Sequence, residues 1–212
     1  TPNVVILDIG CGTGIVTRQL ARYGVKIFGS DKDAEMVKIA EEKNTANITY
    51  TVAQASKMPF DNNQFDAATA FSAFHWFSDK ESVNEIRRVL KNKGVFFVVN
   101  KNDAGDFKKG YKDMLRAFIP GELPDVKKQY LPEKILWKDG FVDVQKNIFG
   151  TSEFFTLAQA VTYLQSVSIW NLVPEGRKPQ ALQALETYCR NRLVNDYIER
   201  KLEIVAVVAR KS

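Results

Sequence analysis

The sequence predicts an α/β fold built on a doubly wound, parallel sheet. Residues 4–9 form an almost continuous apolar run, as a central strand covered on both faces does. A glycine-rich loop follows, and residues 15–22 then carry apolar side chains at helical spacing. Further strand candidates alternate with helical segments up to residue 100. Because parallel neighbours need crossover connections, this alternation indicates parallel strands with helices on both faces of the sheet.

The loop after the first strand carries glycine at every second position, at Gly10, Gly12 and Gly14, and Asp8 stands where the strand ends. Without a Cβ, glycine lets the backbone turn sharply and approach a ligand closely. This strand–loop–helix unit is typical of a nucleotide-binding fold, with a helix N-terminus facing the ligand. The third glycine falls one residue too early for a dinucleotide fingerprint, and no Walker loop is present. The alternative is a plain tight turn that Asp8 caps.

Composition narrows the class of protein. At 212 residues the chain is long enough for a sizeable core, and we treat residues 1–212 as a single domain. The net charge of +5 is scattered, so no nucleic-acid partner is expected. Cys11 and Cys189 form no disulfide or ligand pattern, and no metal site is predicted. With no signal peptide and no stretch of membrane-spanning length, a cytoplasmic protein without a membrane partner is expected.

The second strand, residues 25–31, places Asp31 at its carboxyl end, about 20 residues beyond the glycine loop. A carboxylate there can accept hydrogen bonds from both hydroxyls of a ribose. The alternative role, capping the next helix, fits Asp33 better. That helix, residues 34–43, opens with Met36, which either packs on a ligand or fills the core.

An edge strand is expected at residues 48–53 and a fourth strand, beside the first, at residues 65–71. Past the end of the fourth strand stands His75, the one histidine of the chain, among the aromatic residues Phe74, Trp76 and Phe77. Open α/β sheets bind ligands beyond the carboxyl ends of their strands, so this loop is a candidate site. The alternative is a structural histidine wedged among aromatic rings.

A capping box at residues 78–81 predicts a helix that starts after Ser78. Basic residues followed by glycine predict its end at residues 91–94, before an apolar fifth strand at residues 95–100. Prolines then break the pattern, and residues 101–140 are predicted to form a small helical insertion. Trp170 is either an aromatic wall of a site or a core residue. The remaining elements predicted are a strand at 141–149, a helix capped by Thr156 and Gln159, a helix at 179–195 and a strand at 202–209.

The acidic strand end followed by G-x-G-x-G resembles motif I of the class I S-adenosylmethionine-dependent methyltransferases. Residues 53–66 match the frame of the ubiquinone-biosynthesis-like branch, except that Gln54 replaces the usual aspartate. A glutamine amide can still accept from and donate to an adenine ring. The His75-Trp76 pair resembles the signature of the trans-aconitate methyltransferase type. A family enzyme carries a helix before its first strand, so this sequence is expected to be trimmed.

The resemblance implies a Rossmann-like fold, with a mostly parallel seven-stranded sheet, a final antiparallel strand, and residues 101–140 covering the substrate. It implies methyl transfer from S-adenosylmethionine to a small-molecule acceptor, with His75 as the candidate base. In the same way, Asp8 would face the cationic end of the cofactor and Asp31 its ribose. The cofactor residues implied are Asp8, Gly10, Cys11, Gly12, Gly14, Asp31, Lys32, Met36, Gln54, Ala55, Ser56, Phe71 and Ser72, and the substrate residues are Phe74, His75, Trp76 and Trp170.

Two other functions remain open from the sequence. The first is a protein that binds S-adenosylmethionine without catalysis, which the change to Gln54 keeps in view. The second is an NAD-dependent oxidoreductase on a related fold, which the glycine spacing disfavours. Enzymes that methylate DNA bases are disfavoured because their Asp/Asn-Pro-Pro-Tyr/Phe and Pro-Cys motifs are absent.

Overall fold

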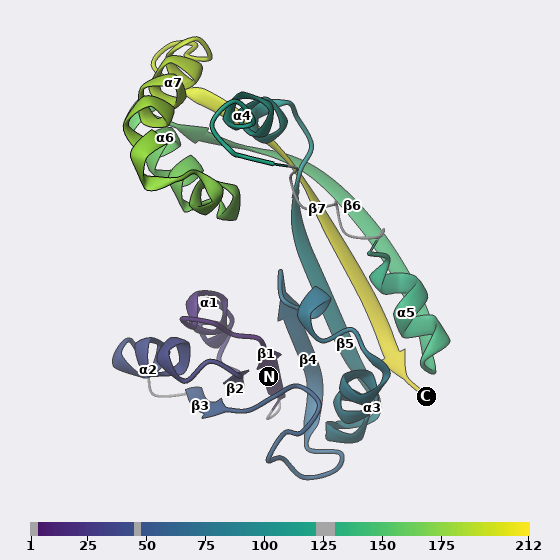
Figure 1. Cartoon of the computed structure of the whole chain (residues 1–212). Coiled ribbons are helices and arrows are strands. Elements are labelled where there is room, and N and C mark those ends of the chain that lie inside the picture. Colours follow the sequence, from purple (N-terminus) through teal and green to yellow (C-terminus); the bar gives the residue numbers. More distant parts are fainter. Residues whose placement is uncertain (1–3, 45–47, 122–129) are drawn as a thin grey trace. The chain divides into compact units, whose positions relative to one another are not determined.

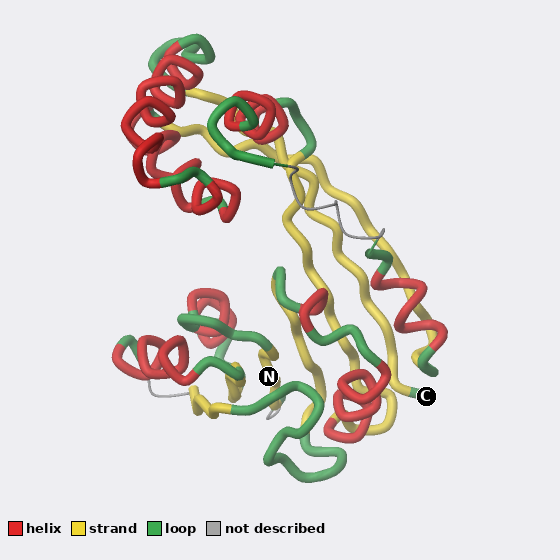
Figure 2. Tube along the Cα trace, viewed as in Figure 1, coloured by secondary structure: helices red, strands yellow, loops and turns green. Residues whose placement is uncertain are grey.

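The computed structural model describes residues 4–44, 48–121 and 130–212 (Figures 1 and 2). A single sheet has the strand order β3-β2-β1-β4-β5-β7-β6, so the seven-stranded α/β fold predicted from the sequence is confirmed. β1 through β5 pair in parallel, and β7 is the antiparallel strand between β5 and β6. The strands are β1 (Val5–Ile9), β2 (Lys26–Asp31), β3 (Ile48–Val52), β4 (Phe65–Phe71), β5 (Leu90–Asp103), β6 (Phe141–Phe155) and β7 (Ile198–Lys211).

The strand order changes direction at β1, which lies between β2 and β4. Chain connections leave β1 and β4 toward opposite sides of the sheet at such a point, and the carboxyl ends of the strands border a crevice. In the register of the sheet, Asp8 lies beside Gly29 of β2 and Thr69 of β4. The acidic end of the first strand therefore stands at the centre of this switch point.

The chain divides into two compact units, each with its own core. The first comprises Thr1–Asn100, Gln129–Ile148 and Val205–Ser212, and the second comprises Lys101–Lys128 and Phe149–Ile204. The segment predicted as one insertion, residues 101–140, is divided between the two units, and its residues 122–129 lie outside the described part of the chain. No described helix is long and apolar enough to cross a membrane.

The helix starts of the first unit follow their local sequence, except that the cap of α3 lies one residue later than predicted. Asp33 caps α2, accepting hydrogen bonds from the amides of Glu35 and Met36, as predicted. The cap of α3 is Asp79 rather than Ser78, because the Asp79 carboxylate accepts from both the amide and the hydroxyl of Ser82. The helices of this unit are α1 (Ile15–Ala21), α2 (Ala34–Glu42), the 3₁₀ turn η1 (Phe74–Trp76), α3 (Lys80–Val89) and α5 (Pro132–Lys138).

The predicted helix stop at residues 91–94 is wrong, because these residues belong to β5. Leu90 pairs with Phe65, and the next pair joins Val95 to Ala67, so the extra residues of β5 form an irregularity in the ladder. Lys93 takes a positive φ of 64° within this irregularity. Basic residues and glycine mark helix ends, but here strand pairing on both sides decides the conformation.

The second unit is mainly helical around its own apolar cluster. Thr156 and Gln159 form the predicted capping box at the start of α6, with both reciprocal bonds present. Trp170 is 7% exposed within this cluster, so of its two interpretations the core residue is the one its placement supports. The helices are α4 (Phe107–Leu115), α6 (Leu157–Ser166), η2 (Ser168–Leu172), η3 (Glu175–Arg177) and α7 (Lys178–Arg190), which ends five residues before the predicted end.

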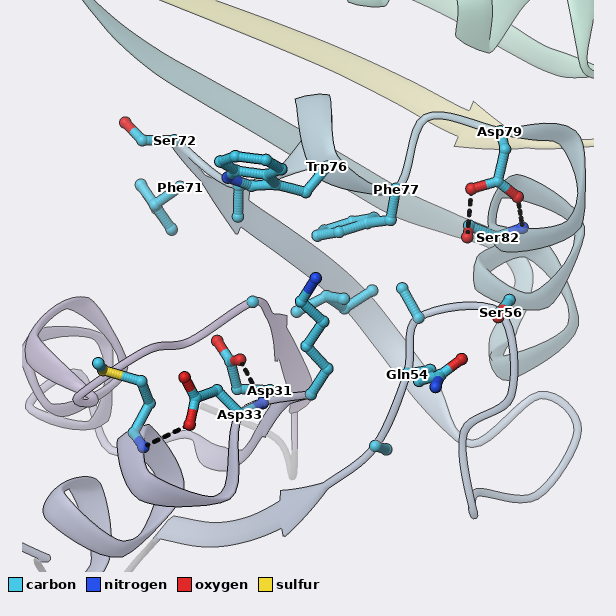
Figure 3. Close-up of a pocket in the computed structure, with 17 residues that line it drawn as sticks. Asp31, Asp33, Gln54, Ser56, Phe71, Ser72, Trp76, Phe77, Asp79 and Ser82 are labelled. Carbon is cyan, nitrogen blue, oxygen red and sulfur yellow. Dashed lines mark hydrogen bonds between the residues drawn. The ribbon is translucent and has the colours of Figure 1, made fainter. Parts of the chain in front are cut away.

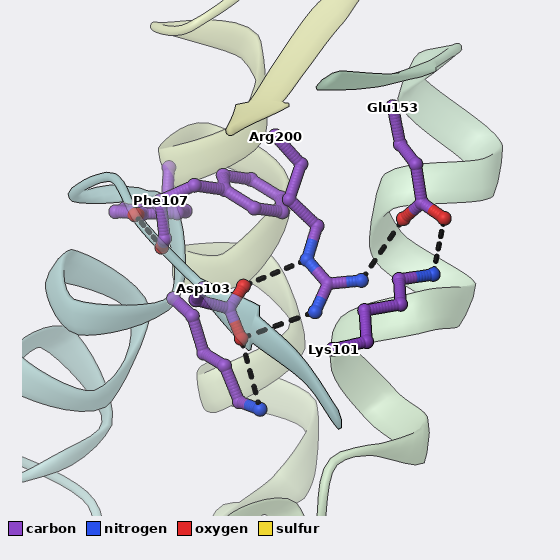
Figure 4. Close-up of polar contacts among 7 residues, drawn as sticks. Lys101, Asp103, Phe107, Glu153 and Arg200 are labelled. Carbon is purple, nitrogen blue, oxygen red and sulfur yellow. Dashed lines mark hydrogen bonds and ion pairs between the residues drawn. The ribbon is translucent and has the colours of Figure 1, made fainter. Parts of the chain in front are cut away.

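An ion cluster around the buried Arg200 joins three strands inside the second unit (Figure 4). The Arg200 guanidinium of β7 donates to both carboxylate oxygens of Asp103 on β5, at 2.7 and 3.0 Å, and to Glu153 on β6 at 3.0 Å. Its charged plane also lies 4.4 Å from the ring of Tyr163. Lys101 pairs with Glu153. Every charge here has an opposite partner, which is the condition under which buried ions are tolerated.

Candidate functional site

A cavity of about 680 Å³ opens at the carboxyl ends of β1, β2 and β4, within the first unit (Figure 3). This volume lies in the usual range of small-molecule pockets, roughly 300–1,000 Å³. Three stretches of the chain build it: the glycine loop with the end of β2, the loop after β3, and the segment after β4. The lining residues are Ile9, Gly10, Asp31, Lys32, Asp33, Met36, Ala53, Gln54, Ala55, Ser56, Phe71, Ser72, Ala73, Trp76, Phe77, Asp79 and Ser82.

The three glycines of the loop have positive φ angles for different physical reasons. A Cβ on Gly10 would stand 2.6 Å from the Cβ of Ala73, and one on Gly14 would collide with the hydroxyl of Tyr50. A Cβ on Gly12 would meet nothing within 4 Å. Packing therefore requires the first and third glycines, whereas the second turns its bare Cα toward open space.

Asp31 ties the glycine loop to the end of β2. One carboxylate oxygen accepts from the amide of Gly12 at 2.9 Å, and the other accepts from the amide of Asp33 at 3.0 Å. Both Asp31 and Asp33 line the cavity (Figure 3). Each carboxylate oxygen can accept more than one hydrogen bond, so Asp31 keeps acceptor capacity toward the cavity.

Asp8 lies beneath the loop, and it is not among the residues that line the cavity. Its carboxylate is 1% exposed and accepts from the hydroxyls of Thr17 at 2.6 Å and Thr69 at 3.0 Å. Burial raises the pKa of Asp8 to about 6, the two hydroxyls oppose this shift, and the like charge of Asp31 adds to it. The prediction that Asp8 faces a ligand directly is therefore wrong. The glycine loop lies between the Asp8 carboxylate and the cavity, so its charge can act on a ligand only across that loop.

The wall opposite the glycine loop is aromatic. Phe71 ends β4, and Trp76 and Phe77 follow it, with Trp76 68% exposed (Figure 3). Between them Ser72 takes a positive φ of 51° while its amide donates to the carbonyl of Val99 at 2.7 Å. A non-glycine residue in this conformation costs backbone energy, and such residues gather at functional sites.

Two residues predicted to face a substrate lie elsewhere. Phe74 is fully buried in the core, where its ring lies 5.3 Å from Phe96, so it is not a wall of the cavity. His75 is exposed and does not line the cavity, although it belongs to the same 3₁₀ turn as Trp76. Its ring contacts Trp76 on one side, at 4.9 Å, and Tyr130 on the other, at 6.1 Å.

Most of the predicted cofactor residues come together at the cavity. Those that line it are Gly10, Asp31, Lys32, Met36, Gln54, Ala55, Ser56, Phe71 and Ser72, together with Trp76 from the predicted substrate set. Those that do not are Asp8, Cys11, Gly12, Gly14, Phe74, His75 and Trp170. The Cys11 thiol contacts the carbonyl of Gly12, and burial raises its pKa, which keeps it protonated.

Sequence reasoning missed Asp79 and Ser82, from the first turn of α3, among other lining residues. Their capping role accounts for both residue types, so the sequence held no separate signal for the cavity. Phe77 also lines the cavity; the sequence places it with Phe74 and Trp76 in one aromatic loop, although it was not among the predicted site residues. The lining residues outside the predicted set are Ile9, Asp33, Ala53, Ala73, Phe77, Asp79 and Ser82.

Comparison with known proteins identifies the domain. Residues 7–98 match the family model of a methyltransferase domain. Residues 7–98 therefore form a methyltransferase domain of this family. The matched residues contain the glycine loop, Asp31 and every residue that lines the cavity.

Curated relatives of this methyltransferase domain are similar over part of their length. The chain is 36% identical over 169 residues to an uncharacterized protein of Methanocaldococcus jannaschii, covering 69% of this chain and 64% of that one. It is 36% identical over 121 residues to a demethylmenaquinone methyltransferase of Thermotoga maritima, covering 54% and 52%. With an uncharacterized methyltransferase of Bacillus subtilis the match spans 40% of the relative. The chain thus spans about half the length of these relatives.

Solved structures establish the same fold over the whole chain. The YcgJ protein of Bacillus subtilis has a TM-score of 0.62 at 22% identity, covering 99% of this chain and 92% of that one. A methyltransferase structure from Anaeromyxobacter dehalogenans has a TM-score of 0.66 at 18% identity, covering 99% and 89%. At these identities the likeness concerns the fold, and function rests on the residues of the cavity.

Proposed function

We propose that this chain binds S-adenosylmethionine in the cavity at the β1–β2–β4 switch point and transfers its methyl group to a small-molecule acceptor. The observation that carries the proposal is the pairing of Asp31 with the glycine loop at a cavity inside the matched methyltransferase domain. The family supports S-adenosylmethionine as the cofactor. The cavity volume fits a nucleoside of that size.

Charge around the cavity favours the same ligand. The lining carries the carboxylates of Asp31, Asp33 and Asp79 against the single ammonium of Lys32. S-adenosylmethionine bears a sulfonium and an ammonium against one carboxylate, so it is cationic overall. A negative cavity attracts such a ligand and repels a pyrophosphate compound.

Each part of the cavity has a proposed role. Asp31 uses its remaining acceptor capacity to accept hydrogen bonds from the ribose hydroxyls. Gln54 replaces the usual carboxylate at the adenine, where its amide oxygen accepts and its amide nitrogen donates. Phe71 and Trp76 supply apolar surface that excludes water from the reacting groups.

The reaction is an in-line displacement, for which the bound cofactor supplies a methyl group already activated by the positive sulfur. The chain therefore acts by holding the acceptor in line and keeping water out, because proximity and orientation can supply most of the rate. A base is required only when the acceptor must lose a proton. His75 keeps that role as a proposal: it lies beside Trp76 on η1, and its ring faces Tyr130.

Calorimetric titration tests the proposal. S-adenosylmethionine is expected to bind and NAD is not, and Asp31→Ala is expected to weaken S-adenosylmethionine binding more than tenfold without unfolding the protein. Asp33→Ser is the matched control, because it removes a neighbouring charge from the cavity but keeps a side chain that caps α2. Equal losses in the two variants would reduce Asp31 to a general charge effect. Tight NAD binding with no S-adenosylmethionine binding would refute the cofactor.

A second candidate function is binding of S-adenosylmethionine without catalysis. Two observations favour it: Gln54 departs from the family pattern, and His75 does not line the cavity. The discriminating measurement is release of S-adenosylhomocysteine across a panel of small carboxylic acids, phenols and amines. Turnover with any acceptor supports the transferase. Binding without turnover across the panel supports the non-catalytic function.

A further inference from the structure

A second cavity, of about 580 Å³, lies between α3 and α5 and shares no residue with the first. Both helices belong to the first unit. The first turn of α3 contributes to both cavities: Asp79 and Ser82 line the first, whereas Lys80 lines the second. The residues that line the second cavity are Ser78, Lys80, Asn84, Arg87, Ile135, Lys138, Asp139 and Gly140.

Arg87 is fixed in this cavity with part of its donor capacity unused. Its Nε atom is buried and has no hydrogen-bond partner among the described residues. Its two terminal nitrogens donate to the carbonyl of Asp139 at 3.4 Å and to the hydroxyl of Ser212 at 3.2 Å. A Cβ on Gly140 would stand 2.9 Å from one of these nitrogens, so the guanidinium packs across a bare Cα. Because Nε is closed off from solvent, only the accessible outer part of the guanidinium can meet a ligand in the cavity.

The cavity also carries positive charge that the chain does not neutralise. Lys80, Arg87 and Lys138 line it against the single carboxylate of Asp139. Among the described residues, no carboxylate lies within 4.0 Å of any of these three cationic groups. Burial and the positive charge of Arg87 together lower the pKa of nearby Lys211. The local potential is therefore positive.

Arg88, the next residue along α3, is an arginine whose charge is neutralised by a carboxylate of the same helix. Its guanidinium pairs with Glu85 at 2.7 Å and donates to the carbonyls of Phe60 and Met58. Neighbouring arginines thus differ in kind: Arg88 holds loops of this chain in place, and Arg87 presents charge to a cavity.

We propose that the α3–α5 cavity binds the phosphate group of a phosphomonoester. Three cations suit a dianion better than a carboxylate, and the planar arginine fork matches the oxygen spacing of phosphate. The volume exceeds that of a bare phosphate, so the remainder of the ligand has room beside Ile135. The phosphomonoester is carried either by a soluble metabolite or by a lipid headgroup, and the two sources share this chemistry.

The lysines of α5 provide a matched pair of variants. Lys134 and Lys138 are both exposed and lie about one turn apart, but only Lys138 lines the cavity. Glycerol 1-phosphate is the soluble probe, with glycerol as its neutral control, and binding is followed by the amide NMR shifts of Asn84 and Gly140. Vesicles of phosphatidylcholine with or without phosphatidic acid form the second arm, followed by cosedimentation.

Arg87→Gln and Lys138→Ala are expected to weaken binding of whichever probe binds by at least tenfold, whereas Lys134→Ala changes it less than twofold. Melting temperatures confirm that each variant is folded. Loss confined to the soluble arm identifies a metabolite site, and loss confined to phosphatidic acid vesicles identifies a headgroup site. Equal effects of the two lysines would reduce the site to a diffuse positive surface and overturn the proposal. Binding of neither probe would also overturn it.

Discussion

The buried carboxyl of Asp8 makes a specific prediction about stability and pH. Its pKa rises from 3.8 to about 6 on folding, mainly because burial penalises the charged form. A shift of this size corresponds to about 3 kcal/mol, at roughly 1.4 kcal/mol for each pKa unit. Because Asp8 is 1% exposed, solvent screening does not reduce this figure appreciably.

The sign follows from proton binding. Between about pH 4 and pH 6 the folded state holds a proton on Asp8 that the unfolded state has released. The contribution of Asp8 to the free energy of unfolding is therefore fully present below pH 3.8 and is lost as the pH rises through about 6. Asp8→Asn cannot ionise and lacks this loss. Relative to the wild type, its free energy of unfolding is expected to rise by about 3 kcal/mol from pH 4 to pH 8.

Urea unfolding of the wild type and Asp8→Asn across this pH range measures the difference. Comparing the two curves cancels the contribution of every other titrating group, and it also cancels any constant cost of fitting an amide between Thr17 and Thr69. Asp79→Asn is a control of opposite sign, since hydrogen bonds from Ser82 lower the pKa of Asp79. Parallel curves for the wild type and Asp8→Asn would refute the reasoning.

Three further predictions test other parts of the molecule. Gly12→Ala and Gly14→Ala both place a side chain at positive φ, which should lower the free energy of unfolding by about 1–2 kcal/mol each. The Gly14→Ala methyl group also collides with the hydroxyl of Tyr50, so this variant should lower the melting temperature more. Equal losses in the two variants would contradict the packing argument. Arg200→Met removes the buried cation shared by Asp103 and Glu153, which then keep only the more exposed Lys108 and Lys101 as partners. It should therefore lower the free energy of urea unfolding more than Lys101→Met, for which about 1 kcal/mol or less is expected, and similar costs would show that the burial of Arg200 adds nothing. His75→Ala should spare cofactor binding and lower methyl transfer, and unchanged turnover would leave His75 a packing residue.

Most of the sheet, and the side of the cavity formed by the end of β2 and the loop after β3, could be predicted from local sequence. The apolar run before the glycine loop, the acidic end of β2 and the cap at Asp33 each depend on a few neighbouring residues. Such short-range patterns specify a strand end or a helix start directly. Asp31 and Gln54 could therefore be placed at one edge of the sheet from their positions in the chain.

The sequence-based predictions fail where residues far apart in the chain determine the local conformation. Residues 91–94 look like a helix end, yet β4 pairs on either side of them and draws them into β5. The 3₁₀ turn after β4 directs Phe74 into the core and leaves Trp76 exposed, and adjacent aromatic residues give no sequence signal for which one faces inward. Asp8 lies beneath the loop because Thr17 and Thr69, nine and 61 positions away, hold its carboxylate there.

Adjacent residues at the start of α3 line two cavities of opposite charge. Asp79 contributes to a cavity with an excess of carboxylates, and Lys80 to a cavity with an excess of cations. A cationic ligand is favoured in the first cavity and an anionic one in the second, and exchanging them would place like charges together at both sites. Through its hydrogen bonds with Ser82, Asp79 also caps α3, the helix that carries Arg87. One residue thus lines the first cavity and caps the helix that lines the second.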